Sequence, residues 1–251
     1  MDQLTQYAWI GALVFARLGS VIMLAPGWGE NATPARFRLA AGVLITAILA
    51  PALASKAPPM PPSTGGVIAL VAMEVLTGII LGVGARLLFS AVQVAGAIMG
   101  LASGLGFAQQ VDPLMNQTSA IFSAFLSLMG VVLVMATGLH NVLIAGVASS
   151  YDLFPVGGFP PIGDSVEFVT DTVATAFTLG LQIAAPVLIF SVVFNIGLGF
   201  ASRLIPQVQM YLVAMPASVL LGTAVIALGL GGGLMVWLAA MEREVRLFGA
   251  T

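Results

Sequence analysis

The chain has 251 residues, of which 59% are hydrophobic and 7% are charged, and its mean hydropathy is +1.09. This composition lies far from that of soluble globular proteins and predicts an integral membrane protein. The net charge of −2, with eight scattered basic residues, excludes nucleic acid as a partner, and the lack of Cys excludes disulfides, thiolate metal sites and cysteine nucleophiles.

Six apolar runs follow one another along the chain, and each is expected to form a helical membrane segment. They cover roughly residues 6–26, 39–54, 67–107, 118–149, 172–202 and 204–241. The first run carries Arg17 and has no basic region before it, so it is expected to be a retained helix rather than a signal peptide. Because 67–107 is longer than one span needs, we expect a hairpin or a broken pair there, which leaves a seventh span open. The predicted fold class is an all-α membrane protein with about six hydrophobic helical segments, including broken or hairpin helices.

Proline and glycine mark the connections between these runs. The segment SKAPPMPPSTGG (55–66) is predicted to be a linker between helices, and YDLFPVGGFPPIGDS (151–165) a second connector. In RLIPQVQ (203–209), Pro206 lacks an N–H and biases the residue before it away from helical geometry. We therefore expect a helix corner at Pro206 and Gln207.

Four charged residues lie inside apolar runs, where an isolated charge is costly. They are Arg17, Glu74, Arg86 and Arg203. Glu74 and Arg86 share one run but are about 18 Å apart along a straight helix, so they cannot pair with each other. Each needs a partner on another helix, a watery cavity, or a place at the membrane edge. The favoured interpretation is packing between helices or subunits, and the alternative is a proton or ion relay.

Glycines recur at four-residue spacing in two places. Gly78 and Gly82 form one pair, and Gly96, Gly100 and Gly104 form a row of three. Small residues at this spacing allow two helix backbones to approach closely within a membrane. We expect close helix contacts at these glycines, within the chain or between subunits.

Several chemistries are not supported by the residues. His140 is the single histidine and has no carboxylate at ligand spacing, so neither a metal site nor a catalytic triad is expected. The glycines at 229–233 lack the lysine and hydroxyl of a phosphate loop, and no carboxylates are paired for acid–base work. The sequence therefore predicts no enzyme, no cofactor and no metal.

The chain resembles the FliR/SctT family, the export-gate membrane proteins of bacterial flagellar type III secretion, whose injectisome relatives share the same plan. The resemblance extends over nearly the whole chain and rests on eight pieces in the family's order. They are FARLGSVIMLAPGWG (15–29), PARFRLA (34–40), EVLTGIILGVGARLLF (74–89) with the AG at 95–96, GLGFAQQVDP (104–113), GLH (138–140), GLQIAAP (180–186) and NIGLGFASRLIPQVQMY (195–211).

The resemblance implies a non-enzymatic core subunit of the flagellar export gate in the bacterial inner membrane, within the flagellar basal body. Its implied partners are FliP-type and FliQ-type subunits, with which it forms a closed conduit for unfolded exported polypeptides, an FlhB-type subunit, and membrane lipid. It further implies a single export-gate domain over 1–251, in which 1–165 is FliP-like and 166–251 is a FliQ-like helical hairpin. The hydrophobic segments would then lie partly outside the bilayer plane.

The resemblance also assigns a role to the amide-rich stretch between two apolar runs. In the family this loop resembles the inner plug of the pore, which here corresponds to Phe107, Gln109, Gln110, Asp112 and Pro113. Uncharged amides would wet a lumen without holding a passing chain by charge, Phe107 would serve as an apolar stopper, and Pro113 would fix the turn. The alternative is an ordinary exposed turn between helices.

Two other functions stay open at this point. One is the equivalent subunit of an injectisome export gate. The other is a stand-alone secondary transporter that uses Glu74 as a coupling carboxylate, although such transporters commonly show paired repeats. The only repeat here is the triplet [AS]RL at 16–18, 85–87 and 202–204, whose spacing is unequal.

Overall fold

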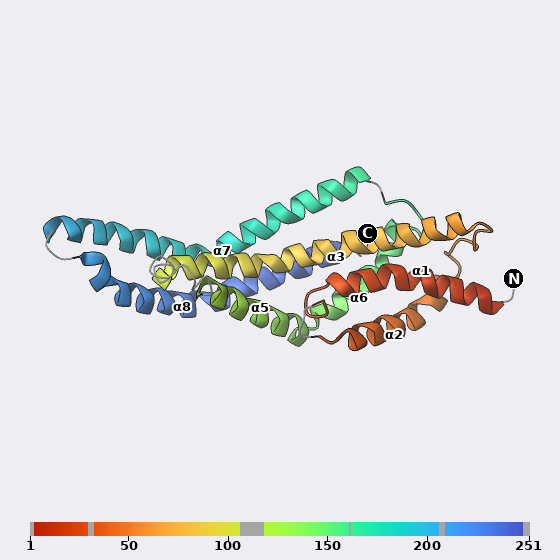
Figure 1. The fold of residues 1–251 in the computed structure, drawn as a ribbon, viewed down its shortest axis with the longest axis horizontal. Helices are drawn as coiled ribbons and strands as arrows, with labels where there is room; N and C mark the ends of the chain where they lie inside the picture. Colours follow the sequence, from red (N-terminus) through yellow and green to blue (C-terminus); the bar gives the residue numbers. More distant parts are fainter. Residues whose placement is uncertain (1–2, 30–32, 106–117, 161, 206–208, 248–251) are drawn as a thin grey trace. The chain divides into compact units, whose positions relative to one another are not determined.

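The computed structural model of the chain describes residues 3–29, 33–105, 118–160, 162–205 and 209–247 (Figure 1). Its helices are α1 (Gln3–Leu24), α2 (Ala35–Leu53), α3 (Thr64–Gly100) with the π-helical turn η1 (Leu101–Leu105), α5 (Thr118–Ala136), α6 (Leu139–Leu153), α7 (Ile162–Leu204) and α8 (Met210–Leu247). Among the described residues, five helices are long and apolar enough to cross a membrane, and the number is six if the bent pair of α5 and α6 forms one span. The predicted all-α membrane fold with about six segments is thereby confirmed.

The hairpin expected within 67–107 is not formed, because α3 is a single helix of 37 residues. Its backbone leaves helical geometry at Gly104, where φ is 86°. The expectation was wrong because it treated the thickness of the hydrocarbon layer as an upper limit on helix length. A helix can exceed that thickness by tilting or by continuing beyond the bilayer.

The run 118–149, by contrast, is broken. α5 and α6 meet at an angle of 71°. Gly138, which precedes α6, has φ 75° and ψ 11°, the left-handed conformation that ends many helices and that glycine adopts without strain. Gly138 therefore turns the chain after α5 and allows a separate helix to begin at Leu139.

Two compact units make up the chain, and each is formed from segments that are distant in sequence. The first comprises Met1–Leu88, Val134–Val173 and Met241–Thr251, and the second comprises Phe89–Leu133 and Ala174–Ala240. The division into parts 1–165 and 166–251 concerns relatedness to FliP and FliQ rather than compactness, and it stays a prediction.

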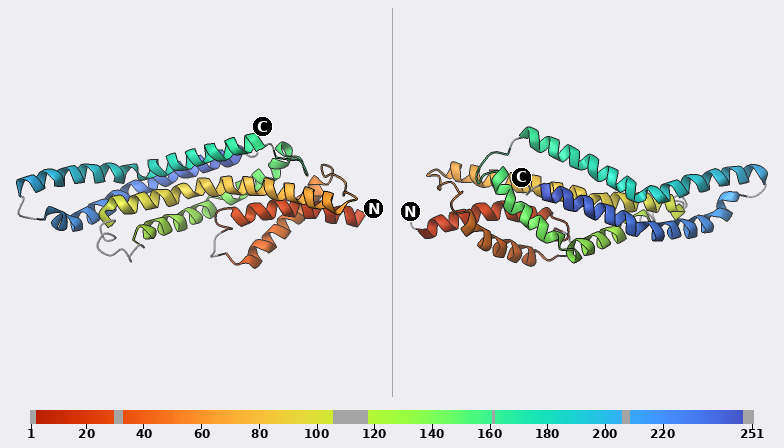
Figure 2. Two further views of the ribbon diagram at one scale, coloured as in Figure 1. Left: turned by 45° about the horizontal axis from the view of Figure 1, so that its top comes forward. Right: turned by 180° about the vertical axis from the view of Figure 1, so that it is seen from behind.

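In the first unit, α1 and α2 lie side by side (Figure 2) and enclose apolar side chains with the start of α3 and α6. Trp9 is buried in this core, and its indole N–H donates to the carbonyl of Pro58 at 3.2 Å. The proline-rich linker is thus fastened to α1. Other members of this core are Ile10, Leu13, Val14, Ala50, Leu53, Tyr151 and Val156.

In the second unit, α5 and α8 each run antiparallel to the end of α3. Phe89 near the start of this part of α3 packs edge-to-face on Trp237 of α8, with ring centroids 5.8 Å apart. Beyond the end of α3, Ser103 and Gly104 of η1 lie against the earlier α8 residues Gly222 and Ser218. Rising positions along α3 and η1 therefore meet falling positions on α8.

α7 and α8 are antiparallel as well. Ile183 of α7 contacts Gly233 of α8, and Pro186, one turn later in α7, contacts Gly229, one turn earlier in α8. The long helices on either side of 205–209 are thus paired. The predicted corner residues themselves, Pro206 and Gln207, lie outside the described residues.

Candidate functional site

Arg17 on α1 and Glu74 on α3 form a buried ion pair in the first unit. Nε of Arg17 donates to Oε2 of Glu74 at 2.7 Å, and Nη2 donates to Oε1 at 3.2 Å. The side chains are 0% and 1% exposed. Two charge-assisted hydrogen bonds with this fork geometry are strong, and in such a dry place each charge depends on the other.

Further contacts join the ion pair to α6 and to the segment that follows it. The Arg17 guanidinium donates from Nη1 to Oγ of Ser150 at 3.2 Å and from Nη2 to the carbonyl of Phe154 at 3.0 Å. Its Cζ lies 3.9 Å from the centre of the Tyr151 ring, a cation–π contact. Glu74 Oε1 also accepts a hydrogen bond from the backbone N–H of Gly157 at 2.6 Å. The pair therefore holds 154–157 against three helices.

Gly157 can occupy this place because it has no side chain. Its φ is 76°, and a Cβ there would lie 2.7 Å from Cδ2 of Leu70 and 3.2 Å from Cγ of Pro58. The left-handed backbone turns the Gly157 N–H toward Glu74. An L-residue at this position would be strained in its backbone, would collide with the side chain of Leu70 on α3 and would crowd Pro58 of the linker.

Gly78 and Gly82 bring α3 close to α1 next to the ion pair. A Cβ at Gly78 would collide with the carbonyl oxygen of Arg17 and would lie 2.8 Å from Cβ of Ser20. A Cβ at Gly82 would lie 2.9 Å from Cβ of Leu24. The same short spacing that lets the backbones approach also lets Arg17 reach Glu74 across the interface.

The second glycine row faces helices of the second unit. A Cβ at Gly96 would lie 2.6 Å from Cα of Ser123 on α5, and one at Gly104 would lie 2.5 Å from Oγ of Ser218 on α8. Gly100, which lies between Gly96 and Gly104 in the sequence, is also buried. These are contacts within one chain, and a role of the row in contacts between subunits stays a prediction.

The two remaining membrane arginines are placed differently from Arg17. Arg86 on α3 and Arg203 near the end of α7 are both exposed. They do not belong to the buried network, and their assignment to subunit assembly stays a prediction. The plug residues, Phe107, Gln109, Gln110, Asp112 and Pro113, lie outside the described residues.

The part of the chain that the structure describes contains no group of three or more His, Asp or Glu side chains able to hold a metal ion. His140 lies near the start of α6, with Nδ1 3.4 Å from the carbonyl oxygen of Val134 in α5. Its ring is thus placed against the bend between α5 and α6.

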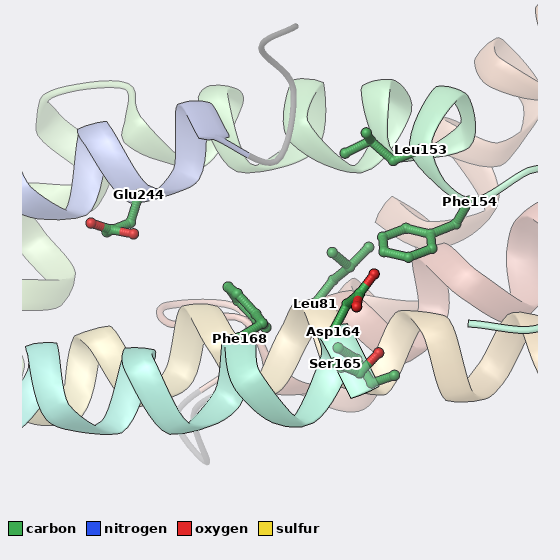
Figure 3. Close-up of a pocket in the computed structure, with 8 residues that line it drawn as sticks. Leu81, Leu153, Phe154, Asp164, Ser165, Phe168 and Glu244 are labelled. Carbon is green, nitrogen blue, oxygen red and sulfur yellow. The ribbon is translucent and has the colours of Figure 1, made fainter. Parts of the chain in front are cut away.

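A half-open pocket of about 250 Å³ lies in the first unit (Figure 3). Its walls are mainly apolar, and the carboxylates of Asp164 and Glu244 are among the groups that line it. The labelled lining residues are Leu81 of α3, Leu153 and Phe154 at the end of α6, Asp164, Ser165 and Phe168 of α7, and Glu244 of α8.

Sequence reasoning identified Arg17 and Glu74 as charges in need of partners but did not identify their partners. Ser150, Tyr151, Phe154 and Gly157 were missed because they lie in α6 and in a connector that composition marks as a loop. A usable signal was the cost of two buried charges of opposite sign in different apolar runs. Backbone partners such as the Phe154 carbonyl leave no signal in the side-chain sequence.

The fold and the buried network define a helical membrane protein in which the Arg17–Glu74 ion pair joins α1, α3 and α6. Comparison with known families is consistent with that class. The model of a family described as "Bacterial export proteins, family 1" matches residues 8–243, and the chain belongs to this family. The family is one of export proteins and not of enzymes.

Individual relatives agree with this placement. The chain is 42% identical to a flagellar biosynthetic protein FliR from Caulobacter vibrioides over 229 residues, which is 91% of each chain. It is 29% identical to FliR of Pectobacterium carotovorum over 92% of this chain and 85% of the relative. A more distant relative, Yop proteins translocation protein T of Yersinia pestis, is 25% identical over 59% of this chain and 57% of its own.

Proposed function

We propose that the chain is a core subunit of the flagellar type III protein export gate. In this proposal it forms a closed conduit with FliP-type and FliQ-type subunits, is met by an FlhB-type subunit, and passes unfolded flagellar proteins across the bacterial inner membrane at the basal body. The observation that carries the proposal is the 42% identity to a FliR over 91% of both chains.

The exposed surface of the helices supports a protein that works inside an assembly. Large apolar side chains stand free on α2, α7 and α8, among them Ile48 at 74%, Leu228 at 87% and Met235 at 75% exposure. Surface of this kind requires lipid or neighbouring membrane subunits to cover it.

The plug assignment belongs to the same proposal. Phe107, Gln109, Gln110, Asp112 and Pro113 would close the conduit in the resting gate, with Phe107 as the apolar stopper. Their place after η1, whose last turn is anchored on α8 through Gly104 and Ser218, would give such a loop a fixed origin.

The injectisome alternative has one observation in its favour, the match to the Yersinia translocation protein. That match covers a smaller share of the chain at lower identity than the flagellar ones, so the flagellar function is preferred. A transporter that couples through Glu74 is not supported, because both carboxylate oxygens of Glu74 are occupied by Arg17 and Gly157 and the side chain is 1% exposed.

Deletion of the gene in its host, followed by complementation, tests the proposal. We expect loss of flagellin export and motility, restored by the intact chain, and co-purification of the tagged chain with FliP-type and FliQ-type subunits in mild detergent. Normal flagella in the deletion strain, or a purified lone monomer or homodimer that transports a small solute, would refute it. Loss of effector secretion with flagellin export intact would favour the injectisome.

A further inference from the structure

A half-open groove of about 340 Å³ lies between α1 and α2, which run side by side in the first unit (Figure 2). Its walls include Phe15, Gly19 and Met23 of α1 and Leu39 and Gly42 of α2. Gly19 keeps the groove open, because a Cβ at this position would meet only the ring of Phe15, at 3.9 Å. The groove is therefore wide enough and apolar enough for a flexible hydrocarbon chain.

One end of the groove is cationic. The groove begins at the first turn of α2, where Ala35 and Arg38 line it. Of the described residues that line the groove, Arg38 is the one with a charged side chain, and its Nε is buried without a hydrogen-bond partner in the described part of the chain. Arg36, in the same turn, is exposed. Neither Arg36 nor Arg38 takes part in an ion pair among the described residues.

The two arginines add to a positive charge that the helix already has. The N-terminal end of a helix carries a partial positive charge, and acidic side chains are the ones that stabilise its first turn. The first turn of α2 has no acidic residue, and Pro34 at the N-cap makes no side-chain hydrogen bond to the helix. Arg36, Arg38 and the helix dipole therefore all favour an anion at the same place.

A ligand with an anionic head and a hydrocarbon tail satisfies both parts of the groove. The guanidinium groups of Arg36 and Arg38 can donate to phosphate oxygens with the fork geometry that arginine provides. The hydrocarbon tail removes apolar wall from water, including that of Leu39, which is 57% exposed. Basic pockets between membrane helices bind the head groups of anionic lipids for these reasons.

We propose that the groove between α1 and α2 binds an anionic phospholipid. Its phosphate lies at Arg36 and Arg38, and an acyl chain extends between Gly19 of α1 and Gly42 of α2. The bound lipid joins α1 to the first half of α2. The proposed function assigns no ligand to this groove, and the inference does not depend on that function.

Binding to the purified full-length chain in mild detergent tests the head group. The chain is titrated with dioleoylphosphatidylglycerol or with dioleoylphosphatidylcholine, and bound lipid is counted by native mass spectrometry. From the attraction of two arginines to anionic lipid, we expect phosphatidylglycerol to bind about 30-fold more tightly. Arg36→Gln combined with Arg38→Gln should abolish this preference. The matched control, Arg86→Gln combined with Arg203→Gln, removes the same charge from exposed positions that do not line the groove and should preserve it.

Filling the groove tests the acyl chain. Gly19→Leu places a side chain where the hydrocarbon is expected to lie, and it should weaken the binding of both lipids by about tenfold or more, because methylene groups lose their buried place. Gly65→Leu is the control, since a Cβ at Gly65 also meets open space and this residue does not line the groove.

Three results would overturn the proposal. They are equal binding of the two lipids by the intact chain, an unchanged preference in the Arg36/Arg38 double variant, and undiminished binding in Gly19→Leu. The first result needs no variant, so a variant that fails to fold does not protect the proposal.

A neighbouring membrane helix is the alternative occupant, and a second measurement distinguishes it. The chain is extracted from its host membranes in mild detergent together with the subunits bound to it, and the phospholipid that co-purifies is extracted and counted. We expect the intact chain to retain anionic phospholipid that the Arg36/Arg38 double variant loses, with subunit content unchanged. Loss of a subunit from the double variant, without a change in bound phospholipid, would assign the groove to a protein partner and overturn the lipid site.

Discussion

Replacing Glu74 with glutamine should destabilise the first unit strongly, because it leaves the Arg17 guanidinium buried without a counter-charge. Glutamine keeps the shape of the side chain and an oxygen for the Gly157 N–H, so the change isolates the charge. Arg17 would retain Ser150 and the Phe154 carbonyl as partners, at 3.2 and 3.0 Å. Breaking one side of a buried pair typically costs about 3–5 kcal/mol, and we expect a loss in that range.

The control is the double variant Glu74→Gln with Arg17→Met, which removes both charges and fills a similar volume. It should recover about 2 kcal/mol or more of the loss, since no uncompensated charge stays in the core. Unfolding of the purified chain by increasing fractions of a denaturing detergent, followed by the fluorescence of its three tryptophans, measures both variants. A loss below about 1 kcal/mol for the single variant, or a double variant no better than the single, would refute the dry ion pair.

Three further outcomes are expected. Gly96→Ala should lower the yield of folded chain in membranes by forcing α5 outward, whereas Gly11→Ala, with nothing within 4 Å of the new Cβ, should be neutral by immunoblot. Gly157→Ala should cost about 1–3 kcal/mol in the same detergent unfolding assay through its φ of 76°, and Gly163→Ala, also in open space, should not. Phe107→Ala should raise the ion conductance of purified gate complexes with subunit content unchanged. Unchanged conductance in intact complexes would refute the assignment of Phe107 as an apolar stopper.

The amino-acid pattern predicts the helical segments well because apolar runs of this length have few other stable forms in lipid. It fails at 67–107 and at 118–149 for one physical reason. Hydropathy reports what surrounds a segment and says little about where its axis bends. With 29 glycines in the chain, composition does not indicate that Gly138 adopts the left-handed conformation while Gly78 stays helical.

The buried network was predictable in part. The cost of a charge in hydrocarbon shows that Arg17 and Glu74 need partners, but the partners lie 57 and up to 137 residues away in sequence. They meet through the packing of α1, α3 and α6. That packing depends on the shapes of the side chains in contact rather than on the hydropathy pattern of the sequence.

The segment after α6 shows that a proline- and glycine-rich connector can be as constrained as a core helix. Loops are the usual places to insert a tag, a fluorescent protein or a protease site, since added residues there rarely disturb a fold. An insertion between Phe154 and Gly157 would pull apart two backbone groups that Arg17 and Glu74 hold.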